Sequence, residues 1–457
     1  MSSTLSSRAR LAGAALALAS TMLVAIPVAA QQPTPPGVSI GLTYAVGTKP
    51  GVLILPIAGA SGDSIRAILM RDLDFSDRIT VIGNAERPGD SPVAAGAATN
   101  YPLFARLGAV AVIQANLTPT GLAVTIHDVP KQAVARTRAF PLAGTPNSAD
   151  WRMALHGVAD ELEGWITGQR GIAQTQVAFA RGSQIYLTHS DGAVTQVVAG
   201  AGDGVAMSPA WSPSGDQVAF TVLLRAGTQI MVRELPAGAV RRLPTGPGTN
   251  ATPAFSPDGQ TIVYSHGEEA GTDIYALPVR GGSPRRITVG RGTDNISPVF
   301  SPDGRRIAFA SGRTGSPEIW ITDVDGGNSE PLTAFLFGDQ KYRSNPDWSP
   351  DNRQIAFQSQ IAGRFQIVTM TLRDRNVRQH TSDGVNEDPS WAPDSRHVVF
   401  ASNRSGTRQL WVLDTESGRM RQLTRGEAGV RMPAWSPRMS VPGVPGGSSG
   451  SVEPDGR

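Results

Sequence analysis

The side chains that most often carry out catalysis are few in this 457-residue sequence, and they are scattered. Cysteine is absent, which excludes thiol nucleophiles, disulfides, cysteine-bound zinc and lipidation at cysteine. The histidines show neither His-x-x-x-His nor Glu-x-x-His spacing, the usual local signature of a metal enzyme. The six histidines are His127, His156, His189, His266, His380 and His397. We therefore expect no catalytic residue, no resident metal and no cofactor.

Two short motifs resemble functional sites in sequence but lack the flanking elements or ligand spacing that such sites need. A Gly-x-Ser-x-Gly match at 446–450 lies in a Gly-, Ser- and Pro-rich tail, whereas a hydrolase nucleophile needs a strand before it and a helix after it. The stretch DVDGGNSE (323–330) lacks the acidic spacing of a calcium loop and fits a hairpin turn. Neither motif supports catalysis or ion binding.

The second half of the chain is built from a repeat. A phrase of Trp or Phe followed by Ser-Pro or Ala-Pro begins at Trp211, Phe255, Phe300, Trp348, Trp391 and Trp435, at spacings of 44, 45, 48, 43 and 44 residues. Within each period, alternating apolar residues and Gly-containing turns predict four antiparallel strands. Such a period with four strands is typical of a β-propeller blade.

The two ends of the repeat complement each other. The phrase of the second strand occurs six times, first at Val177, yet no Trp-Ser-Pro phrase precedes it. The last Trp-Ser-Pro phrase, within 432–437, has no further strands after it. We therefore predict a six-bladed propeller over 175–437, in which the last strand completes the first blade and removes two free sheet edges.

The repeated side chains have structural explanations. The Trp or Phe of each phrase packs between blades, and the turn residues Asp258, Asp303 and Asp351 shape hairpins without a metal or catalytic role.

The sequence pattern in the first half of the chain predicts a separate α/β domain over 51–168, followed by a linker at 169–174. Strands are expected at 51–58, 77–83, 109–118, 121–129 and 133–142. A first helix carries Ile65, Ile68, Leu69 and Leu73 at helical spacing. A second helix over 147–167 ends at Gly168. The fold class is therefore mainly β, a six-bladed propeller preceded by a small α/β domain.

The two ends of the sequence predict a targeting signal at the N-terminus and a disordered segment at the C-terminus. Two arginines, an apolar run and small residues before Gln31 predict a secretory signal peptide over 1–30, cleaved after Ala30. An uncleaved membrane anchor is the alternative, because the apolar run nears the length that spans a bilayer. Residues 31–50 form an N-terminal segment, and 438–457 are expected to be disordered. The charge balance of 41 basic and 38 acidic residues argues against nucleic-acid binding.

Several motifs together resemble the TolB family of the Tol-Pal system. They are LPIA (55–58), RDLDFSDRI (71–79), ALHGVADELEGWITGQRG (154–171) running into TQVAFARGSQIYLT (175–188), and an ending near PAWSP (433–437). The resemblance implies a periplasmic, non-enzymatic scaffold that supports outer-membrane integrity and constriction during cell division. Its implied partners are the peptidoglycan-associated lipoprotein Pal, bound by the propeller, and a TolA-like Tol inner-membrane protein, contacted by the N-terminal region.

The resemblance also implies binding residues. Family contacts with Pal fall just before the proline of the repeat, which corresponds here to Thr249, Thr252 and Ile296. We extend the predicted Pal site to neighbouring positions, Asn250, Asn295, Asn345, Asn386 and Glu387. The family's N-terminal switch corresponds to the alternating residues Val38, Ile40 and Leu42, which could add as a strand to another sheet or be an ordinary edge strand.

The strand order predicts which propeller face binds a partner. In a four-stranded blade, the first–second and third–fourth turns share one face, and the second–third loops share the other with the blade-to-blade loops. The first set is tight, whereas the second set, including LLRAGT (223–228) and GRTGSP (312–317), is longer. We expect docking on this longer-loop face, because rigid scaffolds carry function on their loops.

Two other function classes use similar propellers. An exported peptidase-type hydrolase would need a catalytic domain far larger than the residues that follow Pro437. A carbohydrate-binding propeller would show exposed aromatic residues on its loops, and these loops carry few.

Overall fold

The structure is a computed structural model that describes residues 48–439, except 84–90, 95–97, 201, 203, 291, 334–341 and 427. The predicted signal peptide, the switch residues Val38, Ile40 and Leu42, and most of the predicted tail lie outside the described residues. Residues Ile40–Arg457 form one compact unit. None of the helices in the described part of the chain is long and apolar enough to span a membrane.

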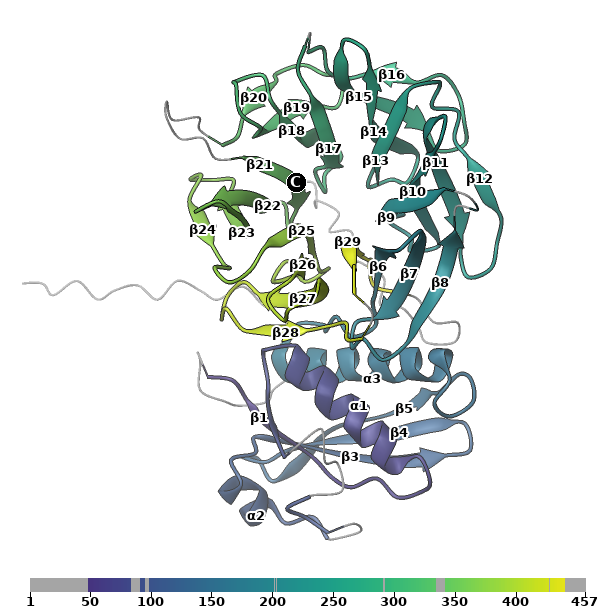
Figure 1. Cartoon of the computed structure of the whole chain (residues 1–457). Helices are drawn as coiled ribbons and strands as arrows, with labels where there is room; N and C mark the ends of the chain where they lie inside the picture. The colour runs from purple at the N-terminus through teal and green to yellow at the C-terminus, as the bar shows by residue number, and fades with distance from the viewer. Residues whose placement is uncertain are drawn as a thin grey trace, which may run out of the picture. The chain divides into compact units, whose positions relative to one another are not determined.

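The α/β domain is a five-stranded sheet of order β2-β1-β3-β4-β5, with β1 parallel to both its neighbours and β3 to β5 antiparallel (Figure 1). The strands are β1 (Gly51–Ile54), β2 (Thr80–Ile82), β3 (Ala111–Thr118), β4 (Gly121–Asp128) and β5 (Ala133–Pro141). The helices are α1 (Gly62–Phe75), α2 (Tyr101–Arg106) and α3 (Ala149–Thr167). The first strand is shorter than the sequence indicated, and α2 was not predicted.

Helix α3 forms where its sequence pattern requires. Ser148 caps its start by accepting a hydrogen bond from the Trp151 backbone N–H. Gly168 ends it at a φ of 78°, a left-handed conformation that favours glycine. The buried stripe of α3 packs with α1 against one face of the sheet, and α2 contributes Phe104 to the core on the other face.

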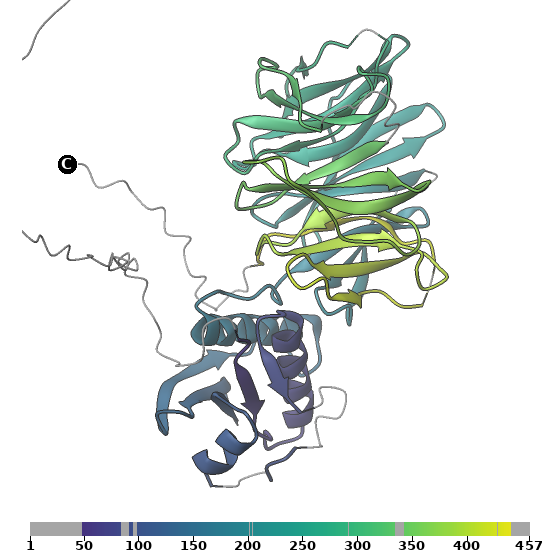
Figure 2. The ribbon, with the colours of Figure 1, turned by 90° about the vertical axis from the view of Figure 1, so that its left-hand side faces the viewer.

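The propeller consists of six four-stranded antiparallel sheets around a channel (Figure 1), and Figure 2 shows the same ribbon from the side. Blade 1 holds β29 (Arg431–Trp435), β6 (Gln176–Arg181), β7 (Gln184–His189) and β8 (Thr195–Gly200). Blade 2 holds β9 (Val205–Trp211), β10 (Gln217–Leu224), β11 (Gly227–Glu234) and β12 (Val240–Arg242). Blade 3 holds β13 (Thr249–Phe255), β14 (Thr261–Glu268), β15 (Gly271–Pro278) and β16 (Arg285–Arg286).

Blade 4 holds β17 (Asn295–Phe300), β18 (Arg306–Ser311), β19 (Glu318–Asp323) and β20 (Glu330–Pro331). Blade 5 holds β21 (Arg343–Trp348), β22 (Gln354–Ile361), β23 (Arg364–Thr371) and β24 (Val377–Gln379). Blade 6 holds β25 (Asn386–Trp391), β26 (His397–Ser402), β27 (Gln409–Asp414) and β28 (Met420–Gln422). The predicted fold class, a six-bladed propeller with a small α/β domain, is confirmed.

The ring closes at the seam between β29 and β6, as the incomplete ends of the repeat predicted. The two strands are antiparallel, with Ala434 opposite Ala178 and Trp435 opposite Val177. The Trp435 indole donates a hydrogen bond of 2.8 Å to Thr175 Oγ1. The seam thus joins the first strand of the propeller along the chain, β6, to its last strand, β29.

The loops differ from the sequence expectation in one respect. The stretch 223–228, predicted as a longer loop, is a tight hairpin, because only Arg225 and Ala226 lie outside β10 and β11. The stretch 312–317 does form a loop between β18 and β19. The longer loops on this face of the propeller are therefore mainly the connections between successive blades.

Candidate functional site

Six residues with the same backbone conformation line the channel, one from each innermost strand. Each precedes the proline of its repeat and has a φ between 49° and 56°: Ser208, Thr252, Ser297, Asn345, Asp388 and Met432. Each also falls where the pairing of the first and second strands shifts register. A left-handed non-glycine residue is strained, and the surrounding structure must hold it in place. We call this set the channel ring.

Hydrogen bonds between blades hold the channel ring. The backbone N–H of Thr252 donates to Thr221 Oγ1 of the preceding blade at 3.1 Å. The N–H of Met432 donates likewise to Asp388 Oδ2 at 3.1 Å. Burial raises the pKa of Asp388, although the Met432 N–H opposes that shift. The centre of the propeller is therefore organised before any partner arrives.

The channel contains a cavity of about 490 Å³. Its lining runs from the channel ring along the following residues of each innermost strand, and it reaches the proline of the next turn at Pro213, Pro350 and Pro437. The cavity therefore lies in the half of the channel nearer to the tight turns. Of the predicted Pal-binding residues, Thr252 and Asn345 line this cavity as members of the channel ring, and the others lie toward the half where the innermost strands begin.

Three of the predicted Pal-binding asparagines are fully buried. Asn250, Asn295 and Asn386 each stand two residues before the channel ring, with no exposed surface. The Asn386 amide donates to Gln366 Oε1 at 2.8 Å and accepts from Arg404 Nη2 at 2.9 Å. Equivalent bonds fix the other two amides. These side chains position the loop face and do not form its outer surface.

The other predicted positions differ in accessibility. Thr249 is exposed, and Thr252 and Asn345 belong to the channel ring. Ile296 is half-buried, and Glu387 forms an ion pair with Arg408 of the β26–β27 loop. The structure thus brings all the predicted residues to the beginnings of four innermost strands, and their role in binding stays a prediction.

Exposed apolar side chains add to the longer-loop face. Val289 follows β16 with 72% of its surface exposed, Leu223 lies near the β10–β11 hairpin, and Tyr342 precedes β21. The Tyr342 ring packs edge-on against Phe365 at a centroid distance of 5.5 Å. Apolar side chains held at a rim provide contact area for a protein partner.

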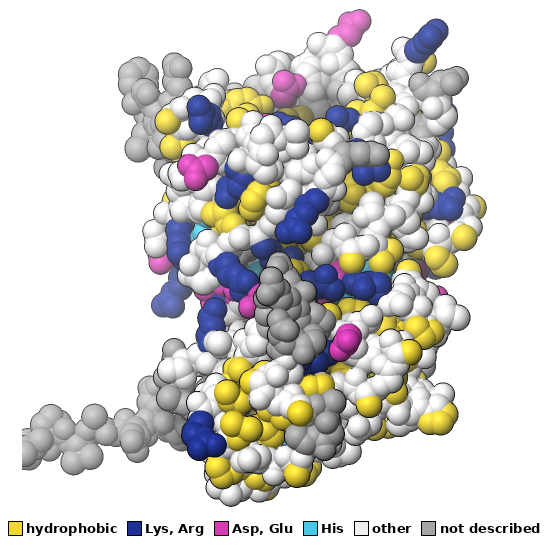
Figure 3. Space-filling view, turned by 60° about the horizontal axis from the view of Figure 1, so that its bottom comes forward, with side chains coloured by type: hydrophobic (Ala, Val, Ile, Leu, Met, Phe, Trp, Pro, Cys, Tyr) yellow, Lys and Arg dark blue, Asp and Glu magenta, His cyan; other side chains and the backbone are white. Residues whose placement is uncertain are grey.

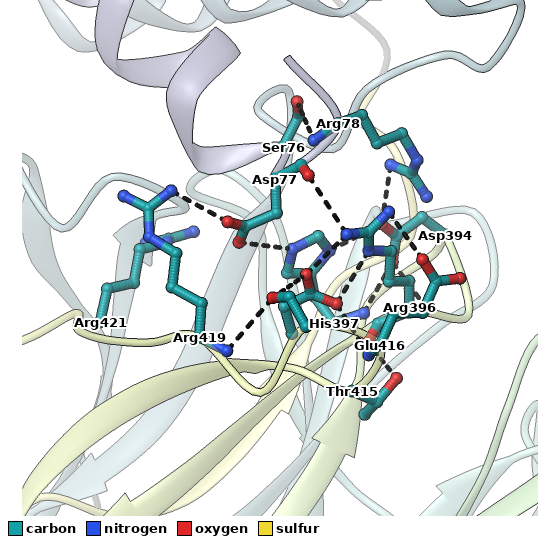
Figure 4. Close-up of polar contacts among 12 residues, drawn as sticks. Ser76, Asp77, Arg78, Asp394, Arg396, His397, Thr415, Glu416, Arg419 and Arg421 are labelled. Atoms are coloured by element: carbon teal, nitrogen blue, oxygen red, sulfur yellow. Dashed lines mark hydrogen bonds and ion pairs between the residues drawn. The ribbon is translucent and has the colours of Figure 1, made fainter. Parts of the chain in front are cut away.

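The tight-turn face of blades 1 and 6 is bonded to the α/β domain. Arg78 donates to Asp394 of the β25–β26 turn at 3.2 Å (Figure 4). It also donates to Glu163 of α3 at 3.2 Å. Arg419 of the β27–β28 turn donates to Asp77 Oδ1 at 2.9 Å. Figure 3 shows Lys and Arg side chains gathered in a band across the middle of the view, with acidic side chains among them.

A buried histidine lies at the centre of the contact with blade 6. His397 Nδ1 is 2.8 Å from Asp394 Oδ2, and its Nε2 is 3.4 Å from Asp77 Oδ2 (Figure 4). Burial would raise the pKa of Asp77, but hydrogen bonds from His397 and Arg419 lower it below its usual value. Burial, reinforced by the charge of Asp160, raises the pKa of Glu163 to about 8.

A second buried histidine lies at the contact with blade 1. His156 Nδ1 is 2.7 Å from Asp72 Oδ2, and its Nε2 is 4.0 Å from Asp191 Oδ2 of the β7–β8 turn. Arg152 and Arg71 also pair with Asp191. Burial opposes ionisation of Asp191, but the charges of His156, Arg152 and Arg71 lower its pKa to about 2.

Two groups in the described residues have donor atoms close enough to hold a metal ion. They are His156, His189 and Asp191, and Asp77, His397 and Asp414. In each group, arginine guanidinium groups already bond the carboxylates: Arg152 and Arg71 at Asp191, Arg419 at Asp77, and Arg396 at Asp414. A cation would have to compete with these positive charges, so both groups are better described as ion-pair networks.

A closed ring of six four-stranded sheets, with an α/β domain on its tight-turn face, defines a six-bladed β-propeller protein with a small N-terminal domain. A family model described as the TolB beta propeller domain matches residues 164–439, more than half of the chain. The chain belongs to the TolB family, as its motifs indicated.

Relatives agree with this assignment. The Tol-Pal system protein TolB of Haemophilus influenzae is 26% identical over 211 residues, which cover 42% of this chain and 47% of the relative. That of Methylococcus capsulatus is 32% identical over 214 residues, covering 43% and 48%. The chain thus spans about half the length of the curated relatives it matches. A crystal structure of TolB from Acinetobacter baumannii shares the fold, with a TM-score of 0.72, 24% identity, and coverage of 85% of this chain and 97% of that one.

Sequence reasoning missed the contact between the domains. Asp77 and His397 are 320 positions apart in the sequence, so no local spacing links them. One signal was present. The turn of blade 6 reads Asp-Ser-Arg-His at 394–397, where blades 3 and 4 have Asp-Gly.

Proposed function

We propose that this protein is a periplasmic, non-enzymatic scaffold of the Tol-Pal envelope system. Membership of the TolB family supports the proposal, together with relatives that are named Tol-Pal system proteins. In this proposal the predicted signal peptide exports the chain. The propeller binds the lipoprotein Pal, the N-terminal region binds a TolA-like inner-membrane partner, and the protein joins the envelope only through these partners. Its role is to support outer-membrane integrity and constriction during division.

One observation carries the proposed Pal site. The tight-turn face is bonded to the chain's own α/β domain at blade 6 and, through Asp191, at blade 1. The longer-loop face instead bears exposed apolar side chains over buried amides that fix its loops. A surface that is ordered beforehand loses little conformational entropy on binding. The longer-loop face is therefore the better docking surface.

The substitution Val289→Asp tests this face. We expect the Kd for the soluble domain of the Pal encoded in the same genome to rise about tenfold, roughly 1.4 kcal/mol, because a carboxylate would be desolvated without a partner. Titration calorimetry measures the Kd, and thermal unfolding should be unchanged. Val377→Asp is the matched control, since Val377 is 55% exposed on the outer strand β24. Equal losses in both variants, or none in Val289→Asp, would contradict a site on this face.

Deleting residues 31–44 tests the N-terminal switch. We expect the deletion to alter binding of the inner-membrane Tol partner and to leave Pal binding largely intact, because the predicted sites lie in different parts of the chain. Pull-downs with each purified partner measure both interactions. Loss of folding in the deletion would show instead that this segment is structural.

A further inference from the structure

The contact between the α/β domain and the propeller contains the same arrangement twice. In each case a buried histidine lies between two aspartates, one from each domain. His156 of α3 lies between Asp72 of α1 and Asp191 of blade 1. At the other position, the histidine comes from blade 6. We call these the two Asp–His–Asp bridges.

The blade 6 bridge reverses the origin of the histidine. His397 belongs to the propeller and lies between Asp394 of its own turn and Asp77 of the α/β domain, at 2.8 and 3.4 Å. His156 and His397 have no exposed surface, and the aspartates are also largely buried. Water therefore does little to screen the interactions between their charges.

The chemistry of imidazole makes both bridges depend on one proton. A carboxylate only accepts hydrogen bonds, so an imidazole can donate toward two carboxylates only when both ring nitrogens carry a proton. Loss of that proton leaves a nitrogen lone pair facing one carboxylate. An attraction between the domains is then replaced by a repulsion.

We propose that these two Asp–His–Asp bridges form a proton-dependent clamp between the α/β domain and the propeller, which loosens when the histidines become neutral. The clamp rests on contacts within the chain and does not depend on which partners bind. It would nevertheless affect any ligand that prefers one arrangement of the two domains, because such a ligand and protons would influence each other's binding.

The neighbouring charges favour the protonated histidines. Burial alone would lower the pKa of His156, but the charge and hydrogen bond of Asp72, with the charge of Asp191, raise it above 6.5. Burial likewise opposes protonation of His397, yet Asp394 and then Asp77 raise its pKa. Other charged or titratable groups around the two bridges include Lys49, Arg71, Asp74, Arg78, Arg152, Asp160, Glu163, His189, Arg396, Asp414, Glu416, Arg419, Arg421 and Arg438.

The sign of the pH dependence follows. A histidine whose pKa is raised on folding contributes stability that is fully present below pH 6.5 and is lost as the pH rises through the raised value. Glu163, with a pKa of about 8, acts in the same direction. His189, lowered to about 4 by burial and by the charge of His156, acts oppositely, but only below about pH 7. The contact between the domains should therefore weaken as the pH rises above 7 and through the raised pKa values of the two histidines.

A distance measurement across the contact tests the clamp. Because the chain has no cysteine, Val134→Cys and Val377→Cys place one spin label on each domain without further changes. Both valines are more than half exposed. With Glu163→Gln in the background to remove that titration, we expect one narrow distance distribution at pH 6 and an added, different population at pH 9. The same distribution at both pH values would overturn the proposal.

Variants of the two histidines show whether these side chains cause the pH-dependent change in the distance distribution. His156→Gln with His397→Gln should broaden the distribution at pH 6 and abolish its pH dependence, whereas His127→Gln, inside the α/β domain, should leave the pH response unchanged. A pH response that persists in the double variant would overturn the clamp. Should the double variant not fold, amide exchange in the unsubstituted chain decides. After correction for the intrinsic effect of pH, residues 70–78 should lose at least tenfold in protection between pH 6 and 9, and constant protection would reject the proposal.

Discussion

A chain that ends at Val430, and so lacks the closing strand β29, should lose the cooperative unfolding of the complete propeller. The truncation removes Trp435, which is 6% exposed and packs in the core shared by blades 1 and 6. Loss of such a side chain alone costs about 3–5 kcal/mol, and the truncation also turns β6 into an unpaired edge. Scanning calorimetry and guanidinium unfolding measure the effect.

Two comparison variants isolate the seam. A chain that ends at Met439 keeps every described residue and should unfold like the full chain. The substitution Trp435→Ala keeps the strand and should lower the free energy of unfolding by about 3–5 kcal/mol. Unchanged stability of the chain that ends at Val430 would show that the ring does not depend on its seam, and the argument for a rigid docking face would fail with it.

The second large effect is expected from Asn386→Ala. The Asn386 amide donates to Gln366 Oε1 and the Asp383 carbonyl, and it accepts from Arg404. Its removal takes one hydrogen bond each from the buried Gln366, the half-buried Arg404 and the Asp383 carbonyl, so we expect the free energy of unfolding to fall by about 1–3 kcal/mol. Chemical denaturation measures the change. Pal binding should weaken as well, because the loops at the start of β25 lose their support.

The comparison of stability with binding decides the role of this asparagine. Asn116→Ala, at an exposed position of β3, is the matched control and should change stability by less than about 0.5 kcal/mol. If Asn386→Ala kept full stability and lost Pal binding, the side chain would have to contact the partner directly. That result would contradict its assignment as a buried support.

The propeller could be predicted because its information is periodic. Each Trp/Phe-Ser-Pro phrase repeats the same strand and turn, and the missing first strand of blade 1 identified the seam with β29. Helix α3 was predicted for a similar reason, since Trp151, Leu155 and Leu162 recur at helical spacing on its buried face. By contrast, α2 is six residues long and depends on a cap by Asn100, which leaves too few residues for a periodic signal.

The site was predicted less completely, for physical reasons. Asn250, Asn295 and Asn386 are part of the predicted Pal site only as neighbouring positions of the motif residues. The sequence does not show whether the amide of such an asparagine points to solvent or into a hydrogen-bond network. The left-handed channel ring precedes prolines, where the sequence would suggest extended backbone. Contacts such as Arg78 with Asp394 join residues 316 positions apart and follow only from the packed fold.

The seam also determines how the molecule would carry a mechanical load. Besides the contacts with blades 1 and 6, a pull on the α/β domain reaches the ring through the short segment 168–175. The load then enters at β6, which three register pairs join to β29. Bonds from Arg438 to the Gly171 carbonyl and from Met439 to the Gln174 carbonyl tie the outgoing chain to that segment. The strain would therefore be shared between the first and last strands of the ring, so that tension from one end of the scaffold is resisted where the circle closes.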